Sequence, residues 1–554
     1  MRRFVLGSSL FMAVALLLMA CGGGAAPQAT PVVSPPQGVT PGAQPTAAAG
    51  APKRGGVVTI GSIQEPNTLN PLLTNLTVSQ EAYTLFLDAL MKIDTNGQIL
   101  PFLAKEVPTT ANGDISADGK TYTFHLRDNV KWSDGQPFTS ADVAFTYQAT
   151  IDPKVNVVTR PPGMTGIASV ETPDATTVIF HLKDAQAPWL LTWVGTAILP
   201  KHVLDGQDIN TAKWNTAPTV GTGPFLFSEW VSGSYILGKK NPNYYLGEPY
   251  LDQVIYRIIP DSNALLAAQQ KGDVDMRYAM TADQVAIVSA LPDWTVTHTP
   301  SYSVFHFTIN TADPIMSDVR VRQALTYALD KKGITQTILK GLVEPSWSPL
   351  TPASWAFDAN VTKFDYNPDK AKQLLDDAGW KLNPASGVRE KDGKPLAFAI
   401  TNISGDAERL QIVQIAQQQW KAVGAQVDIN LVDAATFVKT MQSGNFPIAY
   451  GFWGAGPDPD SMLSTWFYGK GNNWQRLNLP QLDSLIDQAR VTLDQNKRKD
   501  LYIQAQELIA QQAPNIFIYS RVFFDGVKKK VHNFKPVGGG GVNTWNVNEW
   551  WIDQ

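Results

Sequence analysis

The chain has 554 residues, 44% of them apolar, and its 45 Lys and Arg against 49 Asp and Glu give a formal net charge of −4. A single hydrophobic core stops growing near about 250–300 residues, so this length predicts at least two folding units. Binding to nucleic acid needs clustered Lys and Arg to neutralise phosphates. The longest basic run is three lysines at 528–530, and the composition therefore argues against a nucleic-acid partner.

The first twenty residues have the pattern of a secretory signal peptide. Arg2 and Arg3 precede an apolar run, which ends in small residues before Cys21, the only cysteine in the chain. This run is slightly shorter than the ~20 apolar residues of a membrane-spanning helix. Residues 18–21, Leu-Met-Ala-Cys, resemble the lipobox of bacterial lipoproteins. The resemblance implies cleavage before Cys21 and a lipid on its sulfur, which would anchor an exported protein at the outer face of the cytoplasmic membrane.

Residues 21–53 are predicted to be a disordered tether. The segment consists almost entirely of Gly, Ala, Pro, Thr, Gln, Val and Ser, and no charge occurs until Lys53 and Arg54. Such a composition cannot form a hydrophobic core, and its prolines favour extended backbone. We expect the tether to hold a folded body away from the membrane without fixing its orientation.

The part of the sequence that has the pattern of a globular protein begins near Gly55. A strand is predicted over 57–61, a helix over about 79–90, and a strand over 120–127, where polar and apolar residues alternate. Thr139 is expected to cap the next helix, with Asp142 at the third helical position, as in a capping box.

The second half of the chain favours an α/β lobe. A helix capped by Asp318 should run until Gly333 stops it, and another should begin at Pro368 after the cap Asn367 and end at Gly379. Strands and helices then alternate, which is typical of a sheet covered by helices. The predicted segments are a strand at 396–401, a helix to 421, a strand at 427–431, a short helix and a strand at 448–453.

Four motifs, in order along the chain, resemble one known family. They are 122–143 (with Val-Lys-Trp-Ser-Asp-Gly at 130–135), Gly-Thr-Gly-Pro-Phe at 221–225, Val-Arg-Val-Arg-Gln-Ala-Leu at 319–325, and Trp453 with Pro-Asp-Pro-Asp at 457–460. Together they are similar to the extracellular solute-binding proteins that serve oligopeptide, dipeptide and nickel ABC importers. The resemblance covers roughly residues 55–545.

The resemblance implies an α/β, two-lobed, periplasmic-binding-protein-like fold, with a ligand cleft between the lobes and an extra small domain in the first lobe. The chain would cross between the lobes near Asn310 and again near Ser520. Binding would then shift an equilibrium between open and closed forms. The expected limits are 54–97, 200–310 and 520–554 for lobe 1, 98–199 for the small domain, and 311–519 for lobe 2.

Trp453 is the strongest candidate for a ligand-contact position, because it ends a predicted strand before the loop Gly454-Ala455-Gly456. In peptide-binding relatives, main chain beside this tryptophan pairs with the peptide, and an aspartate three positions later holds its α-ammonium group. Here that position is Gly456. Asp458 could replace the missing acid, or it could cap the following helix. Both readings stay open.

Other candidate contacts follow from the same resemblance and are less specific. The proposed ligand-binding residues are Asn75, Thr77, Tyr302, His306, Trp453, Asp458 and Tyr519. Each of those outside the Trp453 loop could equally serve packing. The six histidines contain no pair at i, i+4 spacing, so we expect no metal site, and the resemblance implies no cofactor and no catalytic residue.

The predicted function is that of a monomeric, lipid-anchored receptor that captures short peptides and delivers them to a membrane permease driven by an ATPase. An oligosaccharide is the alternative ligand, since tryptophan faces stack on sugar rings, and lobe 2 contains, among others, Trp347, Trp355, Trp453, Trp466 and Trp474. A nickel chelate is a third possibility. A surface hydrolase has less support, because the chain lacks a Gly-x-Ser-x-Gly elbow, a His-Glu-x-x-His helix and a Walker loop.

Overall fold

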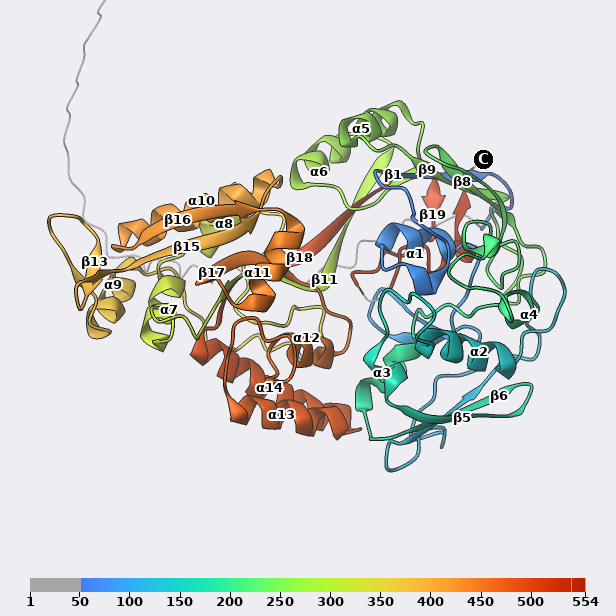
Figure 1. Cartoon of the computed structure of the whole chain (residues 1–554). Helices are drawn as coiled ribbons and strands as arrows, with labels where there is room; N and C mark the ends of the chain where they lie inside the picture. The colour runs from blue at the N-terminus through green and yellow to red at the C-terminus, as the bar shows by residue number, and fades with distance from the viewer. Residues whose placement is uncertain (1–50, 540, 554) are drawn as a thin grey trace, which may run out of the picture. The chain divides into compact units, whose positions relative to one another are not determined.

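Two long strands join the two halves of a ten-stranded sheet in the computed structural model, which describes residues 51–539 and 541–553. β11 (Trp294–Ile309) and β18 (Asn515–Lys528) pair antiparallel from Trp294 opposite Lys528 to Thr308 opposite Asn515. The strand order is β16-β15-β17-β11-β18-β10-β1-β9-β8-β7. Lobe 1 and lobe 2 therefore share one sheet, and β11 and β18 cross between them (Figure 1). The predicted signal peptide, Cys21 and most of the tether lie outside the described residues.

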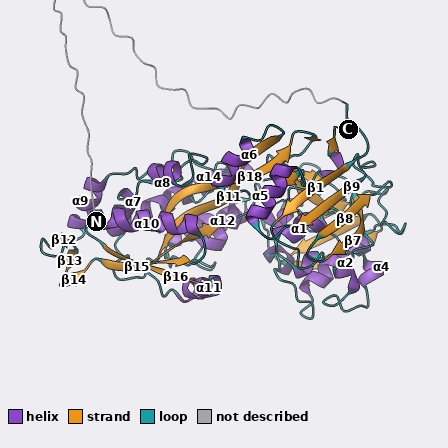
Figure 2. Ribbon diagram, turned by 90° about the horizontal axis from the view of Figure 1, so that it is seen from above, coloured by secondary structure: helices purple, strands orange, loops and turns teal. Residues whose placement is uncertain are grey.

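Lobe 1 is built around β1, which pairs parallel with β9 on one side and β10 on the other. Seen from above, β1, β9, β8 and β7 lie side by side (Figure 2). Val58 and Ile60 of β1 are fully buried in its core. The strands are β1 (Val57–Ser62), β7 (Phe225–Val231), β8 (Tyr235–Lys240), β9 (Gln253–Ile258), β10 (Met276–Arg277), β19 (Val531–His532) and β20 (Trp551–Ile552); the helices are η1 (Pro71–Leu73), α1 (Thr77–Tyr83), α4 (Lys201–Leu204), η3 (Lys213–Asn215), α5 (Ser262–Lys271), α6 (Ala282–Ser289) and η4 (Val547–Glu549).

The segment between β1 and β7 forms a second core, which draws on residues from Leu90 to Ile198. Its three-stranded sheet has the order β4-β6-β5, and four aromatic side chains, Tyr122, Phe124, Phe180 and Trp189, contact one another there. The elements are β2 (Met91–Ile93), β3 (Ile99–Pro101), β4 (Thr121–His125), α2 (Ser140–Ile151), α3 (Pro162–Thr165), β5 (Ile167–Asp174), β6 (Thr177–Leu182) and η2 (Ala187–Trp193).

Lobe 2 is a parallel arrangement of β16, β15 and β17 with helices on both faces. Helices α7, α9 and α10 bury apolar side chains against one face, and α12, α13 and α14 pack against the other. The elements are α7 (Val319–Tyr327), α8 (Lys331–Thr337), α9 (Pro368–Asp377), β12 (Lys381–Leu382), β13 (Arg389–Lys391), β14 (Lys394–Pro395), β15 (Ala397–Ile403), α10 (Ala407–Ala422), β16 (Gln426–Val432), α11 (Ala434–Ser443), β17 (Ile448–Trp453), α12 (Pro459–Trp466), α13 (Pro480–Val491) and α14 (Gln495–Gln512).

Local capping signals are confirmed where they were specific. The Thr139 N–H donates to the Asp142 carboxylate over 2.9 Å, which completes the capping box of α2. The Asn367 side chain accepts from the Lys370 N–H over 2.9 Å at the start of α9. Side-chain caps satisfy N–H groups that a helix start leaves without partners, so the sequence alone locates these two starts.

Two predicted helix limits are wrong for identifiable reasons. Helix α1 ends at Tyr83, seven residues early, because the carbonyls of Leu85 and Phe86 accept from Phe225 and Gly223 instead of continuing the helix. A Cβ on Gly223 would lie 2.4 Å from the Phe86 carbonyl carbon, which explains the glycine of this motif. The helix after Asp318 stops at Tyr327, and Gly333 belongs to the separate helix α8, which Asp330 caps.

The first crossing between the lobes also lies earlier than predicted. Val304 to Ile309 already pair with β17 of lobe 2, and Asn310 donates to the carbonyls of Gly444 and Phe446. The register of β11 against β18 is irregular between Pro300 and Val304. Strand β11 therefore changes lobe near this irregularity, and Asn310 is a residue of lobe 2.

Within the described residues, no helix is both long and apolar enough to span a membrane.

Candidate ligand-binding site

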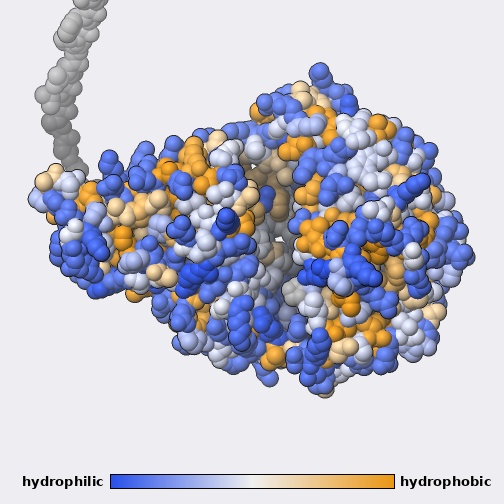
Figure 3. Space-filling view, in the orientation of Figure 1, coloured by the Kyte–Doolittle hydropathy of each residue, from blue (hydrophilic) through white to orange (hydrophobic). Residues whose placement is uncertain are grey.

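Lobe 1 contains a cavity of about 530 Å³. Its walls come from η1 and α1, from residues 194–197, from the end of β10, from β18 and from the segment 537–545. These segments are far apart in the sequence and meet where β18 enters lobe 1. On the face drawn in Figure 3 the surface is hollowed near its middle, and hydrophobic and hydrophilic residues are mixed on both sides of the hollow. A cavity of this size suits a small organic ligand or part of an extended one.

Two buried carboxyl groups line this cavity. Glu81 of α1 accepts a hydrogen bond from the Tyr256 hydroxyl over 2.9 Å, and burial raises its pKa to about 8. Asp525 of β18 is 1% exposed, and burial raises its pKa to about 6. Neither has a cation within ion-pair distance among the described residues. Both acids are therefore available to a donor or a cation that enters the cavity.

The backbone around Asp525 is held in a strained form. Ala279, which also lines the cavity, has a φ of 55°, a left-handed conformation that is unfavourable for a residue with a Cβ. Its N–H donates to Asp525 over 2.9 Å, and the Asn543 amide donates to the other carboxylate oxygen over 3.1 Å. The adjacent Tyr278 hydroxyl is buried without a partner among the described residues. The Tyr278 hydroxyl can therefore still form a hydrogen bond with a ligand, next to an Asp525 carboxylate that two hydrogen bonds hold in place.

Asn75 and Thr77, two of the proposed ligand-binding residues, line this cavity. Both are exposed, and Thr77 is the first residue of α1. Sequence reasoning selected them because they follow the turn at Asn70-Pro71. The structure places their side chains on the same cavity wall as Glu81.

Tyr302 and the loop after Trp453 lie at the edge of the cavity, next to Gly539. A Cβ on Gly539, which has a φ of +149°, would lie 3.2 Å from the Tyr302 ring and 3.9 Å from the Ala455 carbonyl oxygen. Only glycine allows the wall segment to come this close with this backbone conformation. Through Gly539, the 454–456 loop of lobe 2 and Tyr302 of β11 meet the cavity wall.

The side chain of Trp453 is part of the core of lobe 2. It is 3% exposed, stacks on Trp466 at 5.0 Å between ring centroids, and touches His306 at 4.1 Å. His306 is 1% exposed, and burial lowers its pKa to about 3. At neutral pH it is an uncharged packing residue beside Asn515 and Thr308. At position 453, only the main chain and the loop that follows remain available to a ligand.

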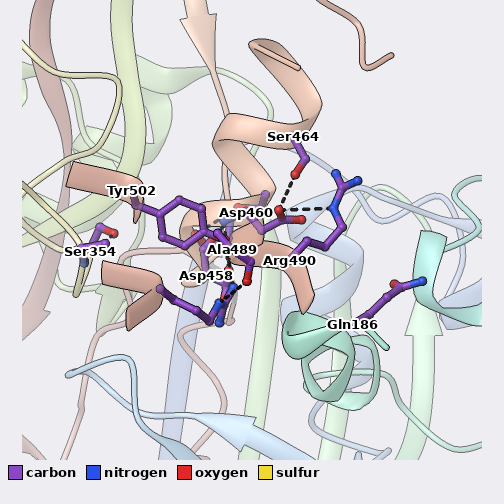
Figure 4. Close-up of polar contacts among 12 residues, drawn as sticks. Gln186, Ser354, Asp458, Asp460, Ser464, Ala489, Arg490 and Tyr502 are labelled. Atoms are coloured by element: carbon purple, nitrogen blue, oxygen red, sulfur yellow. Dashed lines mark hydrogen bonds and ion pairs between the residues drawn. The ribbon is translucent and has the colours of Figure 1, made fainter. Parts of the chain in front are cut away.

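Asp458 is engaged inside lobe 2. Its two oxygens accept from Arg498 over 2.7 and 2.8 Å, and Oδ1 also accepts from the Asp460 N–H at the start of α12. Arg498 further donates to the Ala489 carbonyl and the Tyr502 hydroxyl. Figure 4 shows Asp460 turned instead to Ser464 and Arg490. Asp458 therefore caps helix α12, which is one of its two predicted roles, and Arg498 neutralises its charge.

Tyr519 is buried against lobe 2, where it stacks on Phe305 at 4.6 Å and donates to Glu408 over 3.3 Å. Further along β18, Arg521, Phe523 and Asp525 follow at alternate positions and so share one face of the strand. Phe523 and Asp525 line the cavity. Of the seven proposed residues, Asn75 and Thr77 line the cavity, Tyr302 and the Trp453 loop border it, and His306, Asp458 and Tyr519 are packed elsewhere.

Sequence reasoning missed Glu81, Tyr278, Arg521, Phe523 and Asp525. A signal was present for Arg521 and Asp525, since two charged residues are unusual in the middle of a strand that is otherwise largely apolar. A second signal was the run of four glycines at 538–541, which indicates close approach of backbone. Among the described residues, no group of three or more His, Cys, Asp or Glu is arranged to hold a metal ion.

Comparisons with known proteins agree with this geometry. Residues 98–474 match the model of the bacterial extracellular solute-binding proteins, family 5. The oligopeptide-binding protein AppA of Bacillus subtilis is 29% identical over 98% of both chains. Its structure with a nonapeptide covers 91% of this chain and 100% of its own, with a TM-score of 0.73. NikZ of Campylobacter jejuni, solved with Ni(L-His), is 28% identical, covers 89% of this chain and 99% of its own, and gives a TM-score of 0.75.

The predicted two-lobed α/β fold is confirmed by these structures. The cavity described above lies in lobe 1, whereas the sequence predicted a cleft between the lobes. The family model covers well over half of the 554 residues, and its match runs from the small domain into lobe 2. The chain therefore belongs to the bacterial extracellular solute-binding proteins of family 5.

Proposed function

We propose that this protein captures short peptides and delivers them to an ABC permease. The observation that carries the proposal is the lobe 1 cavity beside the crossing strands, with its buried acids on one wall and the Trp453 loop at its edge. A peptide has donors for those acids and main-chain groups that can pair with the loop. The naming of AppA, an oligopeptide-binding protein similar over 98% of this chain, supports this ligand class.

The proposed site comprises Asn75, Thr77 and Tyr302 from the sequence-based set, together with the main chain of 454–456. Glu81 and Asp525 form its acidic wall and replace the acid that relatives carry at the position of Gly456. Asp458 is left out, because a ligand amine would have to displace Arg498 from a bidentate pair. His306 and Tyr519 act as supports of lobe 2.

The protein is further proposed to be an exported, monomeric lipoprotein, anchored through Cys21 and without catalytic activity. The lipobox at 18–21 and the composition of the tether support export and anchoring. A receptor of an importer must face the outside of the membrane that it serves. Labelling cells with a fatty-acid analogue tests the anchor: wild type should carry the label, and a Cys21→Ala variant should lack it.

An oligosaccharide is the second candidate ligand, and one observation favours it. Trp466 and Trp474 are partly exposed next to the Trp453 loop, with ring centroids 5.1 Å apart. Flat aromatic surfaces of this kind can stack on sugar rings. Trp347 and Trp355 are less suited, because their rings are covered by cations, Lys331 and Lys363 on Trp347 and Arg498 on Trp355.

Native mass spectrometry of residues 53–554, purified without refolding, tests the function directly by weighing the ligand that is carried along. The proposal predicts a set of adducts spaced by amino-acid residue masses. Spacing by hexose or pentose masses would contradict the peptide ligand and favour the tryptophan pair. A single metal-containing adduct of low mass would instead support a chelate.

A further inference from the structure

Arg521 of β18 is a half-buried cation with no acid at ion-pair distance among the described residues. Its guanidinium makes no hydrogen bond or ion pair of 4 Å or less with any other described residue. It is held only by two aromatic rings, Phe523 at 4.5 Å and Phe452 at 5.2 Å from its central carbon to the ring centroids. Cation–π contacts stabilise a guanidinium but leave its five N–H donors unused.

A neighbouring arginine, Arg409 of α10, contacts the same phenylalanine and has an acid at ion-pair distance. The central carbon of Arg409 lies 5.4 Å from the Phe452 centroid, and its Nε is 3.0 Å from the Asp406 carboxylate. Two guanidinium groups therefore share one phenylalanine, and only one has an acid. Glu408 is also near, but it accepts from Tyr519 and is not within ion-pair distance of Arg521. Glu408 therefore acts on Arg521 only from beyond ion-pair distance, and the guanidinium keeps its donors free for a closer partner.

The position of Arg521 links the cluster to the cavity. Phe523, on which it stacks, lines the cavity, and Phe452 is 38% exposed at the end of β17. Alternate residues of a strand point to the same side, so Arg521 and Asp525 lie on one face about 13 Å apart along β18 at ~3.3 Å per residue. An extended peptide covers about the same distance with four residues. The middle of β18 thus presents a basic group, Arg521, and an acid, Asp525, on the same face.

We propose that Arg521 binds a carboxylate of the ligand between Phe452 and Phe523, while the remainder of the ligand extends toward Asp525. The guanidinium fork matches a carboxylate with two parallel hydrogen bonds, and such charge-assisted pairs are the strongest of their kind. This inference rests on the proposed function and deepens it, because it assigns the ligand an acidic end and a direction in the site.

The test compares libraries of tetrapeptides as free acids and as C-terminal amides, bound to the purified protein and measured by calorimetry. Wild type should bind the acids roughly 10- to 100-fold more tightly than the amides. Arg521→Gln should lose that preference by weakening the acids alone, and Arg521→Lys should keep part of it. The matched control is Arg409→Gln, which should preserve the preference because Asp406 already neutralises Arg409. Thermal unfolding of each variant shows that it is folded.

Equal affinity of wild type for acids and amides, or a preference that survives in Arg521→Gln, would overturn the assignment while leaving peptide binding intact. Failure of wild type to bind either library would contradict the peptide ligand instead. In that case the same comparison is made with a sugar ligand: binding of oligogalacturonate, which carries carboxylates, is compared with binding of its methyl ester. Preference for the free acid that depends on Arg521 would support the carboxylate site, and indifference to the ester would reject it.

Discussion

The cavity of lobe 1 and the Asp458 region of lobe 2 bury their acids in different ways. Asp458 has both oxygens on Arg498, and Asp460 is shared between Ser464 and Arg490. Glu81 and Asp525 are as deeply buried, yet they rely on neutral donors and border an empty volume. Ion pairs of the first kind are complete without a ligand, whereas acids of the second kind can still gain a donor. From this difference we infer that the ligand is bound in lobe 1 and that Asp458 stabilises the fold of lobe 2.

Breaking the ion pair in lobe 2 gives the largest expected effect. Asp458→Ala leaves Arg498 buried without its carboxylate, and removing one partner of a buried pair typically lowers stability by about 3–5 kcal/mol. Urea unfolding measures the loss. Calorimetry at a temperature where the variant remains folded should show unchanged ligand affinity. If Asp458→Ala has normal stability but no longer binds the ligand, Asp458 belongs to the binding site, and the contrast drawn between the two regions is wrong.

The acids of lobe 1 should make the protein less stable as pH rises. Because the folded-state pKa of Glu81 is about 8 against 4.5 for a free side chain, the folded protein binds more protons than the unfolded chain between these values. The contribution of Glu81 to the free energy of unfolding is therefore complete below about pH 4.5 and is lost as pH rises through 8. Between pH 6 and pH 8, Glu81→Gln should remove up to about 3 kcal/mol of this decline.

Asp525 should behave in the same way in a lower window, between its ordinary value of 3.8 and about 6. Chemical unfolding of wild type and of Glu81→Gln at several pH values measures both effects. Parallel curves for the two proteins would mean that Glu81 is already ionised in the folded protein at these pH values and that burial does not raise its pKa. A bound ligand cation should instead favour the ionised acids and lower their pKa values.

His306 in lobe 2 should give the opposite pH dependence. Burial lowers its pKa from 6.5 to about 3, so the unfolded chain binds the extra proton between these values. Its contribution to stability is full above about pH 6.5 and is lost as pH falls toward 3, by about 1 kcal/mol per pH unit. His306→Gln should flatten the curve on the acid side only. Unchanged acid sensitivity in this variant would show that the imidazole is protonated in the folded protein.

A smaller effect outside both regions serves as a reference. Thr139→Ala removes one half of the α2 capping box in the small domain and should lower stability by about 1 kcal/mol. Ligand affinity should not change, because the cap lies at the opposite end of α2 from Thr150, the residue of this helix that lines the cavity. If affinity also falls, the small domain is coupled to the site more tightly than its separate core suggests.

The sequence was informative where a structure depends on neighbours along the chain. The caps at Thr139 and Asn367, the strand ending at Trp453 and the alternation through lobe 2 all depend on patterns within about ten residues. The limit of α1 was missed because Gly223 and Phe225, some 140 residues away, take over its carbonyls. Local patterns carry no information about such partners.

The candidate site depended even more on distant partners. Asp458 looked available because Arg498, which neutralises it, follows 40 residues later. The acidic wall combines Glu81 with Asp525, and neither resembles a motif by itself. Asn75 and Thr77 were found only through the resemblance to the family. The polar turn and the first residue of α1 identified the correct wall of the cavity, but they did not indicate the acids beside it.

A crystal structure of the protein purified with its own ligand would test the central claim most directly. The account predicts ligand density in the lobe 1 cavity, in contact with Asn75 and Thr77, and with an acidic group on Arg521. Density confined to the surface of Trp466 and Trp474, with the cavity empty and Arg521 still without an anion, would contradict it.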